Sequence, residues 1–339
     1  GLAFGAFAVS ALLLRPVAGR LCDTRGRRPL LVGGALLAAV AMLLTVLADG
    51  LAAVVALRLL IGVAEGAFMV ASFAALADLA PPSRVGEALS YNSLGLYLGL
   101  ALGPPLGEAL VRGIGYDAAW YAATALCVLA ALAALAIGET REARPPTARP
   151  AALVHSRSIP PALGFFASVV AMGGFLAFAS LHAEGVGMTN ASVPLFTYGM
   201  TVVTCRIVFA RVMDRFPPLV LGAAALVTMA AGLGLVAAWP TPWGVVSGAA
   251  LLGVGIAFST PAFFAAVFAT AAPAERGAAS ATATIFFDLG LGGGPILLGL
   301  VAQGAGIPAA LVVGAAVALA GAAWTLALRQ WSGLRQSTS

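Results

Sequence analysis

The feature that most restricts the fold of this chain is a short basic stretch between two long apolar runs. Residues 1–17 are apolar except for Ser10 and Arg15, and a second apolar run begins at Pro29. The stretch that joins them, RPVAGRLCDTRGRRPLL (residues 15–31), concentrates Arg around a single Asp. Basic residues gather in the cytoplasmic loops of membrane proteins. The stretch therefore predicts a cytoplasmic turn between two membrane-spanning helices, with glycines at its bends.

Composition supports a membrane protein and excludes several kinds of site. The chain is 61% hydrophobic and only 9% charged, against about 25% charged residues in a soluble domain. All 18 basic residues are Arg, which excludes a phosphate-binding or Schiff-base lysine. Two His and three Cys are scattered, so we expect no metal site and no disulfide framework. We read the net charge of +5 as a sign of orientation in the membrane, and we expect no nucleic acid partner.

Eleven apolar runs are long enough to span about 30 Å of hydrocarbon. They cover residues 1–18, 29–48, 51–78, 88–111, 118–138, 160–182, 193–213, 218–238, 243–271, 278–303 and 307–328. Nearly all Arg residues fall on alternate connections between these runs, which is the distribution expected of cytoplasmic loops. We therefore expect a multi-pass protein of the plasma membrane, a bacterial inner membrane, with its central linker and C-terminus in the cytoplasm.

Residues 19–31 follow the pattern G-x-L-x-D-x-x-G-R-R-x-x-L, apart from Thr24 where that pattern often has Arg. This stretch resembles the signature loop between the second and third helices of the major facilitator superfamily. The resemblance implies an all-α membrane protein, two pseudo-symmetric six-helix bundles, with eleven of twelve helices present and the first absent from this chain. It also implies transport by alternating access, with no enzymatic activity.

The chain divides into two related halves. We expect an N-terminal bundle over 1–138, a Pro-rich cytoplasmic linker over 139–160 and a C-terminal bundle with a short tail over 161–339. A shift of 191 residues places the basic stretch on a degraded second copy around Asp214, and places the glycines near residue 100 on those near residue 292. Matching Arg84 to Arg276 requires a one-residue change of register. Parallel six-helix repeats are the architecture of the superfamily that the chain resembles.

The resemblance implies that the basic stretch acts as a conformational latch, in which a carboxylate near a helix end pairs with Arg and closes the cytoplasmic side. A topogenic loop with a solvated Asp is the alternative. The residues assigned to gating are Gly19, Asp23, Arg27, Arg28, Arg84 and Asp214.

Three charged residues inside predicted spans are candidates for proton coupling. Arg58 and Glu65 lie seven residues apart, so both project from one face of a helix, and the segment resembles the R-x-x-x-G motif of the superfamily. Asp288 lies about 15 Å into its helix at 1.5 Å per residue and has no partner within a turn. A carboxylate at the middle of a bilayer suits a proton carrier. A static ion network or a hydrogen bond to a neighbouring helix is the alternative.

Gly99, Gly103, Pro104 and Gly107 resemble the glycine- and proline-containing motif that marks antiporters in the superfamily, although Glu108 replaces its final Gly. Close helix packing by small residues is the alternative interpretation. Polar and aromatic side chains of the central helices either line a substrate cavity or face lipid. The cavity candidates are Tyr91, Asn92, Tyr97, Tyr198 and Phe263.

We therefore expect a secondary active transporter that exports a small, amphipathic molecule in exchange for protons. Its partners are the substrate, protons and the lipid bilayer; we expect a monomer that needs no cofactor beyond a proton gradient. An importer of a sugar or organic acid and a transport-inactive sensor or scaffold are the alternatives. A membrane enzyme is disfavoured, because His and Cys do not converge. The substrate itself does not follow from the sequence.

Overall fold

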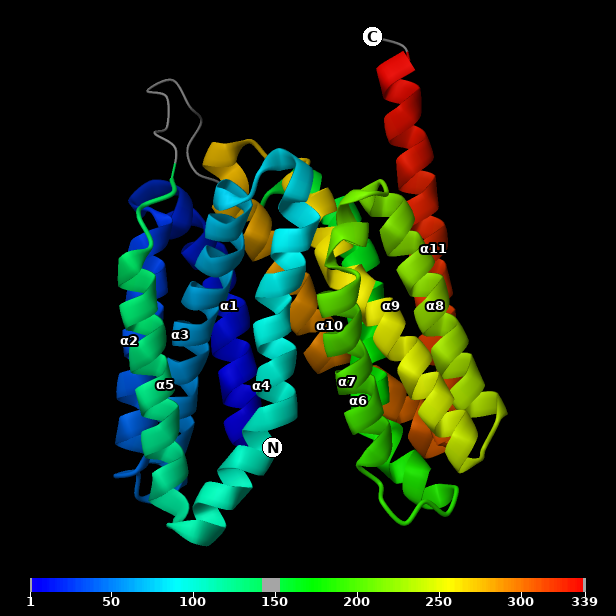
Figure 1. Ribbon diagram of the computed structural model, residues 1–339, viewed down its shortest axis with the longest axis horizontal. Coiled ribbons are helices and arrows are strands. Elements are labelled where there is room, and N and C mark those ends of the chain that lie inside the picture. Colours follow the sequence, from blue (N-terminus) through cyan, green and yellow to red (C-terminus); the bar gives the residue numbers. More distant parts are fainter. Residues whose placement is uncertain (1, 142–152, 338–339) are drawn as a thin grey trace. The chain divides into compact units, whose positions relative to one another are not determined.

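The computed structural model describes residues 2–141 and 153–337, and its regular structure in these ranges is helical throughout (Figure 1). The α-helices are α1 (Leu2–Arg25), α2 (Arg27–Thr45), α3 (Gly50–Leu79), α4 (Val85–Gly113), α5 (Tyr116–Ala136), α6 (Ile159–Gly185), α7 (Val193–Val208), α8 (Pro218–Ala238), α9 (Pro242–Phe268), α10 (Arg276–Ala305) and α11 (Ile307–Ser337). Short 3₁₀ helices are η1 (Pro82–Arg84), η2 (Ser156–Ser158), η3 (Ala210–Asp214) and η4 (Pro273–Glu275). The all-α prediction is confirmed. Each predicted span is centred on one α-helix, but the span predicted over 193–213 runs past the end of α7 into η3.

Several of these helices suit a bilayer. Eight helices in the described ranges are long and apolar enough to cross a membrane by length and composition. Helix α7 is also apolar but has only 16 residues. Half of the predicted linker, residues 142–152, lies outside the described residues.

The predicted cytoplasmic turn is much shorter than its charge pattern suggests. Helix α1 continues through Arg25 and α2 begins at Arg27, so Gly26 alone separates them. Gly26 has φ 108°, a conformation that glycine adopts at little steric cost. Gly19, expected at a bend, lies inside α1 instead. The correction has a physical reason: one glycine with positive φ is enough to reverse the chain, so the charged residues before it remain helical.

Glu139, just after α5, closes this turn. Its carboxylate accepts hydrogen bonds from the backbone N–H groups of Arg27 (2.9 Å), Arg28 (3.2 Å) and Arg141 (2.9 Å). The first two are free donors at the start of α2, which a carboxylate stabilises. A Cβ on Gly26 would collide with the same carboxylate. Burial raises the pKa of Glu139, but the three N–H groups outweigh burial and hold the pKa below its ordinary value of 4.5.

This cap gives the protein an acid-sensitive contribution to stability. Because the pKa of Glu139 is lower in the folded chain, the contribution is complete above pH 4.5 and is lost as pH falls through the folded pKa. We expect Glu139→Gln to lower the thermal midpoint at pH 7. Between pH 5 and pH 3 the thermal midpoint of the variant should then fall by less than that of the unsubstituted protein. Thermal unfolding in detergent across this range measures both effects, with the exposed Glu184→Gln as control. Parallel acid profiles for the two proteins would contradict the assignment.

The helices form two compact units that do not follow the predicted halves. Unit 1 consists of Gly1–Ala80, Leu102–Ser158 and Phe268–Asp288. Unit 2 consists of Pro81–Ala101, Ile159–Val267 and Leu289–Ser339. Thus each unit takes one helix segment from the other predicted half, the start of α10 in unit 1 and the start of α4 in unit 2. The halves defined by the repeat stay a prediction from sequence.

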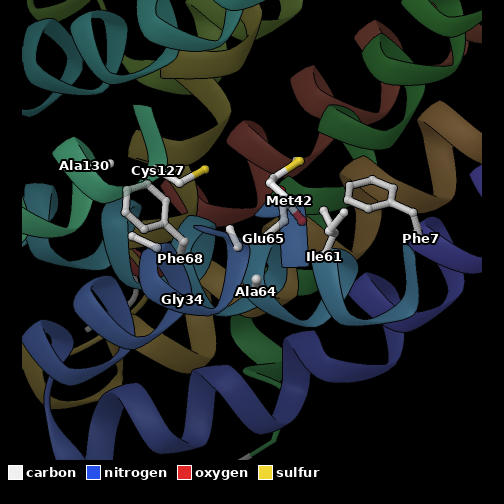
Figure 2. A pocket seen from close by; sticks show the side chains of 11 residues that line it. Phe7, Gly34, Met42, Ile61, Ala64, Glu65, Phe68, Cys127 and Ala130 are labelled. Atoms are coloured by element: carbon white, nitrogen blue, oxygen red, sulfur yellow. The ribbon is translucent and has the colours of Figure 1, made fainter. Parts of the chain in front are cut away.

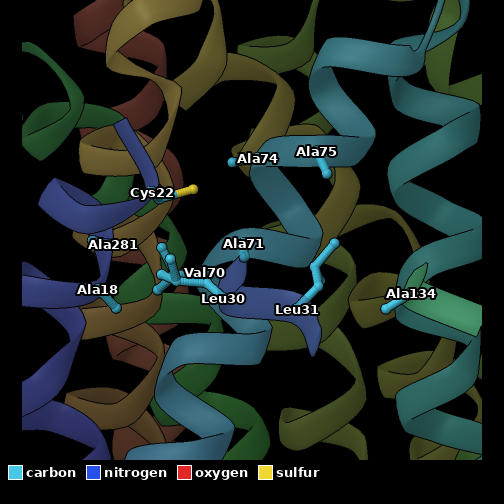
Figure 3. Packing of buried hydrophobic residues seen from close by; sticks show 10 residues of the cluster. All are labelled: Ala18, Cys22, Leu30, Leu31, Val70, Ala71, Ala74, Ala75, Ala134 and Ala281. Carbon is cyan, nitrogen blue, oxygen red and sulfur yellow. The ribbon is translucent and has the colours of Figure 1, made fainter. Parts of the chain in front are cut away.

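The core of unit 1 is built largely from small side chains (Figure 3). Its buried residues are Ala18, Cys22, Leu30, Leu31, Val70, Ala71, Ala74, Ala75, Ala134 and Ala281. They come from α1, α2, α3, α5 and the first part of α10. Small residues allow helix backbones to approach closely in membrane proteins, and Ala281 brings α10 into the same core as α1.

Unit 2 packs α11 along α8 and α6. Phe263 of α9 is fully buried there, with its ring centroid 6.2 Å from that of Phe165. A Cβ on Gly222 would lie 2.9 Å from the Phe263 ring, and one on Gly164 would lie 2.5 Å from it. The two glycines therefore make room for this ring. Phe263, a candidate for the substrate cavity, belongs to the apolar core of unit 2.

Candidate functional site

Asp23 joins α1 to the start of α10 within unit 1. Its buried carboxylate accepts hydrogen bonds from the backbone N–H groups of Gly277 (2.7 Å) and Ala278 (2.9 Å). The Arg27 guanidinium lies 3.5 Å from the same carboxylate. A carboxylate at the N-terminus of a helix binds free N–H groups and the positive end of the helix dipole. Asp23 is therefore an N-terminal cap for a helix that lies more than 250 residues away in sequence.

The cap depends on glycine on both helices. A Cβ on Gly277 would lie 2.6 Å from Asp23 Oδ1 and 2.6 Å from the carbonyl oxygen of Gly19. A Cβ on Gly19 would lie 2.6 Å from that of Ala281. Gly19, assigned to gating, thus permits the close contact between α1 and α10 that places Asp23 against its two donors.

Asp214 makes the equivalent cap in unit 2. Its carboxylate accepts hydrogen bonds from the N–H groups of Gly86 (2.8 Å) and Glu87 (3.1 Å) at the start of α4. A shift of 191 residues takes Asp23 to Asp214 and also takes the Gly86–Glu87 pair to its counterpart at 277–278. The expected change of register at Arg84 is therefore wrong, because the repeat conserves backbone donors and does not conserve the arginine. Arg84 is exposed and bonds Glu87 at 2.6 Å.

Asp78 at the end of α3 is a residue that the sequence analysis missed. Its carboxylate pairs with Arg27 (2.9 Å) and with Arg276 (2.9 Å) at the start of α10. Arg27 also donates to the carbonyl oxygens of Cys22 and Pro273. Arg27 is thus buried with every contact made inside unit 1, whereas Arg28 is exposed and bonds the Leu135 carbonyl. An acid at the end of a predicted span, on the side where the arginines gather, was the signal that could have identified Asp78.

Arg15 of α1 holds two carboxylates at once. Its Nε and Nη2 atoms lie 2.7 and 2.9 Å from the carboxylate oxygens of Asp288 on α10. Its Nη2 atom also lies 3.3 and 3.2 Å from the two carboxylate oxygens of Glu65 on α3. The Arg15 side chain is 1% exposed, against 14% for Asp288 and 30% for Glu65. We call these three residues the carboxylate triad.

The triad supplies partners that local spacing did not identify. Asp288 was predicted to have no partner within a helical turn, and Arg15 on another helix binds it through two hydrogen bonds across 273 positions of sequence. Arg58 was paired with Glu65 by helical spacing, but its guanidinium lies over the Trp120 ring, 5.6 Å from the centroid. In both cases the interaction partner lies on another helix, where spacing along one helix could not identify it.

Glu65 borders a cavity of about 270 Å³ in unit 1. Its side chain lies between the rings of Phe7 and Phe68 and next to Met42 (Figure 2). The lining residues are Phe7, Gly34, Ala35, Ala38, Met42, Ile61, Ala64, Glu65, Phe68, Cys127 and Ala130. Glu65 is the ionisable carboxylate in this otherwise apolar lining. The most exposed residue of the triad therefore lies at the cavity wall.

The other cavity candidates separate into buried and exposed residues. Tyr97 and Tyr198 of unit 2 are buried, with ring centroids 6.4 Å apart. Tyr91 is 49% exposed, and Asn92 is partly buried. The two buried tyrosines thus lie side by side in unit 2.

The glycines that resemble the antiporter motif face open space within the described part of the chain. A Cβ on Gly99, Gly103 or Gly107 would meet no atom within 4 Å, and the side chain of Pro104 lies outside the described residues. In the second copy of the motif the corresponding Gly290 and Gly294 pack against α6, where added Cβ atoms would lie 2.8 and 3.0 Å from Val169 and Val170. Close packing is thus a property of the second copy.

Comparison with known proteins identifies the family. The family model of the Major Facilitator Superfamily matches residues 1–292. The chain belongs to the major facilitator superfamily. It is therefore a multi-pass membrane transporter and not an enzyme.

Two curated relatives cover nearly the whole chain. An uncharacterized transporter of the superfamily from Burkholderia mallei (strain SAVP1) is 30% identical over 95% of this chain and 81% of its own length. Another uncharacterized transporter of the superfamily, from Salmonella typhimurium, is 27% identical over 97% of this chain and 87% of its own length.

Solved structures share the fold at low sequence identity. The human organic anion transporter TETRAN superposes with a TM-score of 0.83 at 21% identity, over 96% of this chain and 83% of its own. The fucose:proton symporter FucP of E. coli gives a TM-score of 0.75 at 17% identity, over 96% and 90%. These superpositions confirm the major facilitator fold for this chain.

Proposed function

We propose that this superfamily member is a secondary active transporter that exchanges protons for a small amphipathic molecule and exports that molecule from the cell. The observation that carries the proposal is the carboxylate triad, in which two acids share one buried guanidinium. When all three groups are ionised, the triad carries one negative charge more than positive, and binding of one proton neutralises it. Uncompensated charge inside a membrane protein is costly and marks functional paths.

Glu65 is the proton carrier of this proposal. Its hydrogen bonds to Arg15 are 3.2–3.3 Å long, whereas those of Asp288 are 2.7–2.9 Å. Glu65 is also the more exposed acid and reaches the cavity. Protonation of Glu65 would therefore break the weaker pair and leave Arg15 with Asp288 alone. Arg58, bound to Trp120, plays no part in this step.

Alternating access needs contacts that form in one state and break in another. The caps of Asp23 and Asp214 fit this role, because each joins a carboxylate from one sequence half to a helix start from the other. Each cap consists of two charge-assisted hydrogen bonds. We propose that both caps, with the Asp78 pairs, hold the cytoplasmic side closed and are released in each transport cycle.

Export, rather than import, is supported by the resemblance of residues 99–107 to the antiporter motif. We further propose a monomer in a bacterial inner membrane, with residues 139–160 and the C-terminus in the cytoplasm, on the distribution of Arg along the chain. A proton gradient alone would drive it, with no bound cofactor. An importer of the same fold is tested by the same experiment.

The test is proton flux in sealed liposomes that contain the purified full chain and a pH-sensitive dye. A proton gradient is imposed and small lipophilic carboxylates, amines and sugars are added outside. We expect one class to dissipate the gradient. Glu65→Gln should slow the flux at least about tenfold, a rise of ~1.4 kcal/mol in the barrier, and Asp288→Asn should also slow it.

Glu184→Gln, an exposed acid in the described ranges, should leave the flux unchanged and serves as the control. Transport without proton movement would contradict the role of the triad. Movement of the compound in the same direction as the protons, rather than in the opposite direction, would identify an importer.

A further inference from the structure

We propose that Arg206 binds the carboxylate of an organic monoanion, and that this anion is the substrate class of the transporter. The inference rests on the proposed transport function and deepens it. It concerns unit 2 alone and does not involve the triad.

Arg206 of α7 is a buried cation for which the described residues supply no counter-charge. Its side chain is 0% exposed, and no carboxylate in the described part of the chain forms an ion pair with it. Nη1 donates to the Ser90 carbonyl at 3.2 Å, and Nη2 to the Ile256 carbonyl at 3.4 Å. Nε has no hydrogen-bond partner. Both carbonyl contacts are long, so an incoming carboxylate can replace them.

The repeat shows what Arg206 lacks. A shift of 191 residues takes Arg15 to Arg206, and the acids that bind Arg15 correspond to Ile256 and Tyr97 in unit 2. The second copy has therefore kept the buried arginine and lost both carboxylates. The same positions still contact Arg206, one through its backbone carbonyl and one through its ring, whose centroid lies 4.7 Å from the guanidinium carbon.

A buried guanidinium without a paired anion destabilises the folded protein, and a paired anion offsets this cost. The Tyr97 ring and two carbonyl dipoles offset part of this cost, but they supply no negative charge. A guanidinium binds a carboxylate through two parallel hydrogen bonds, and in this site the unpaired Nε is available for one of them. Arg206 alone provides one positive charge, so the fitting ligand is a monoanion rather than a phosphate dianion.

The surroundings of Arg206 fit the remainder of such a ligand. Ser90, whose carbonyl contacts Arg206, has a buried hydroxyl without a hydrogen-bond partner in the described part of the chain. Tyr198 is buried beside Tyr97 and lies within electrostatic range of Arg206, and a hydroxyl can donate to a carboxylate. The ring of Tyr198 lies 6.4 Å from that of Tyr97 and 5.7 Å from that of Phe175. Aromatic rings beside a cation favour a carboxylate attached to an apolar or aromatic body.

Binding of phenylacetate to the purified full chain in detergent tests the proposal without any proton gradient. Its uncharged amide, phenylacetamide, has the same body without the charge, and sodium chloride and sodium sulfate test for a general anion effect. We expect phenylacetate to raise the thermal midpoint and the amide and inorganic salts not to do so. Arg206→Gln should weaken phenylacetate binding at least tenfold, and Tyr198→Phe several-fold, while exposed Arg215→Gln leaves binding unchanged.

The outcomes separate this proposal from the proposed function. Equal binding by Arg206→Gln and the unsubstituted protein would overturn the anion site, even where Glu65 still controls proton flux. Carboxylate binding that depends on Arg206, without any proton flux in liposomes, would support the site and overturn the coupling. Where Arg206→Gln fails to fold, Arg206→Lys replaces it: it keeps the charge without the bidentate geometry and should weaken phenylacetate binding but not eliminate it. Unweakened binding in both Arg206→Lys and Tyr198→Phe would overturn the site.

Discussion

Arg15→Gln should destabilise the protein and abolish proton-coupled transport. The substitution leaves Glu65 and Asp288 together without their shared cation, and removal of one partner from a buried charge pair costs about 3–5 kcal/mol. We expect a lower thermal midpoint in detergent and no proton flux in liposomes. The triple variant Arg15→Gln, Glu65→Gln, Asp288→Asn removes all three charges and should recover most of the stability but none of the flux.

The repeat offers a matched control. Arg206→Gln removes the arginine at the equivalent position of unit 2, where no described carboxylate is left unpaired. Without added ligand it should leave the thermal midpoint unchanged or raised. Similar destabilisation by the two substitutions would show that the carboxylates are not the cause, and retention of proton flux in Arg15→Gln would remove the triad from the mechanism.

Gly277→Val is expected to have the second large effect. The Cβ alone would lie 2.6 Å from Asp23 Oδ1, 2.6 Å from the Gly19 carbonyl oxygen and 2.8 Å from the Cys22 Cβ. Two backbones and a buried carboxylate cannot move apart without losing the Asp23 cap. Overpacking of this kind costs about 1–3 kcal/mol. We therefore expect a lower thermal midpoint and slower transport.

Gly33→Val is the control for this substitution. Gly33 is an exposed glycine inside α2, and a Cβ there meets no atom within 4 Å. It tests the intrinsic cost of Val in a helix without the steric conflict. Equal effects at Gly277 and Gly33 would show that helix propensity, not the closeness of α1 and α10, controls the result.

Local patterns were enough to predict the helices. Each predicted span is centred on one α-helix, because an apolar run of sufficient length satisfies its own backbone hydrogen bonds as a helix. The span over 193–213 was predicted too long, since α7 ends at Val208 and η3 follows. The 191-residue repeat was also visible, and it correctly paired Asp23 with Asp214 and Arg15 with Arg206. Both the helices and the repeat depend only on the order and type of residues along the chain.

Contacts between distant residues did not follow from those patterns. Asp288 gains Arg15 as a partner across 273 positions, and Arg58 finds Trp120 instead of Glu65. Helical spacing identifies neighbours on the same helix only. A long charged side chain inside a membrane protein instead binds an opposite charge that a neighbouring helix presents. Asp78 and Glu139 were missed for the same reason, since their partners lie on other elements.

The sequence by itself determined the helical segments, the membrane character and the repeated positions of its charges, because periodicity, length and residue type are local properties. Tertiary structure alone decided which charges meet. It placed the start of α10 against α1, where Gly19 and Gly277 allow two backbones to touch, and so converted Asp23 into a cap and Asp288 into a partner of Arg15. It also left Arg206 without a described counter-charge, because the repeat preserves a position while the residues that surround it diverge.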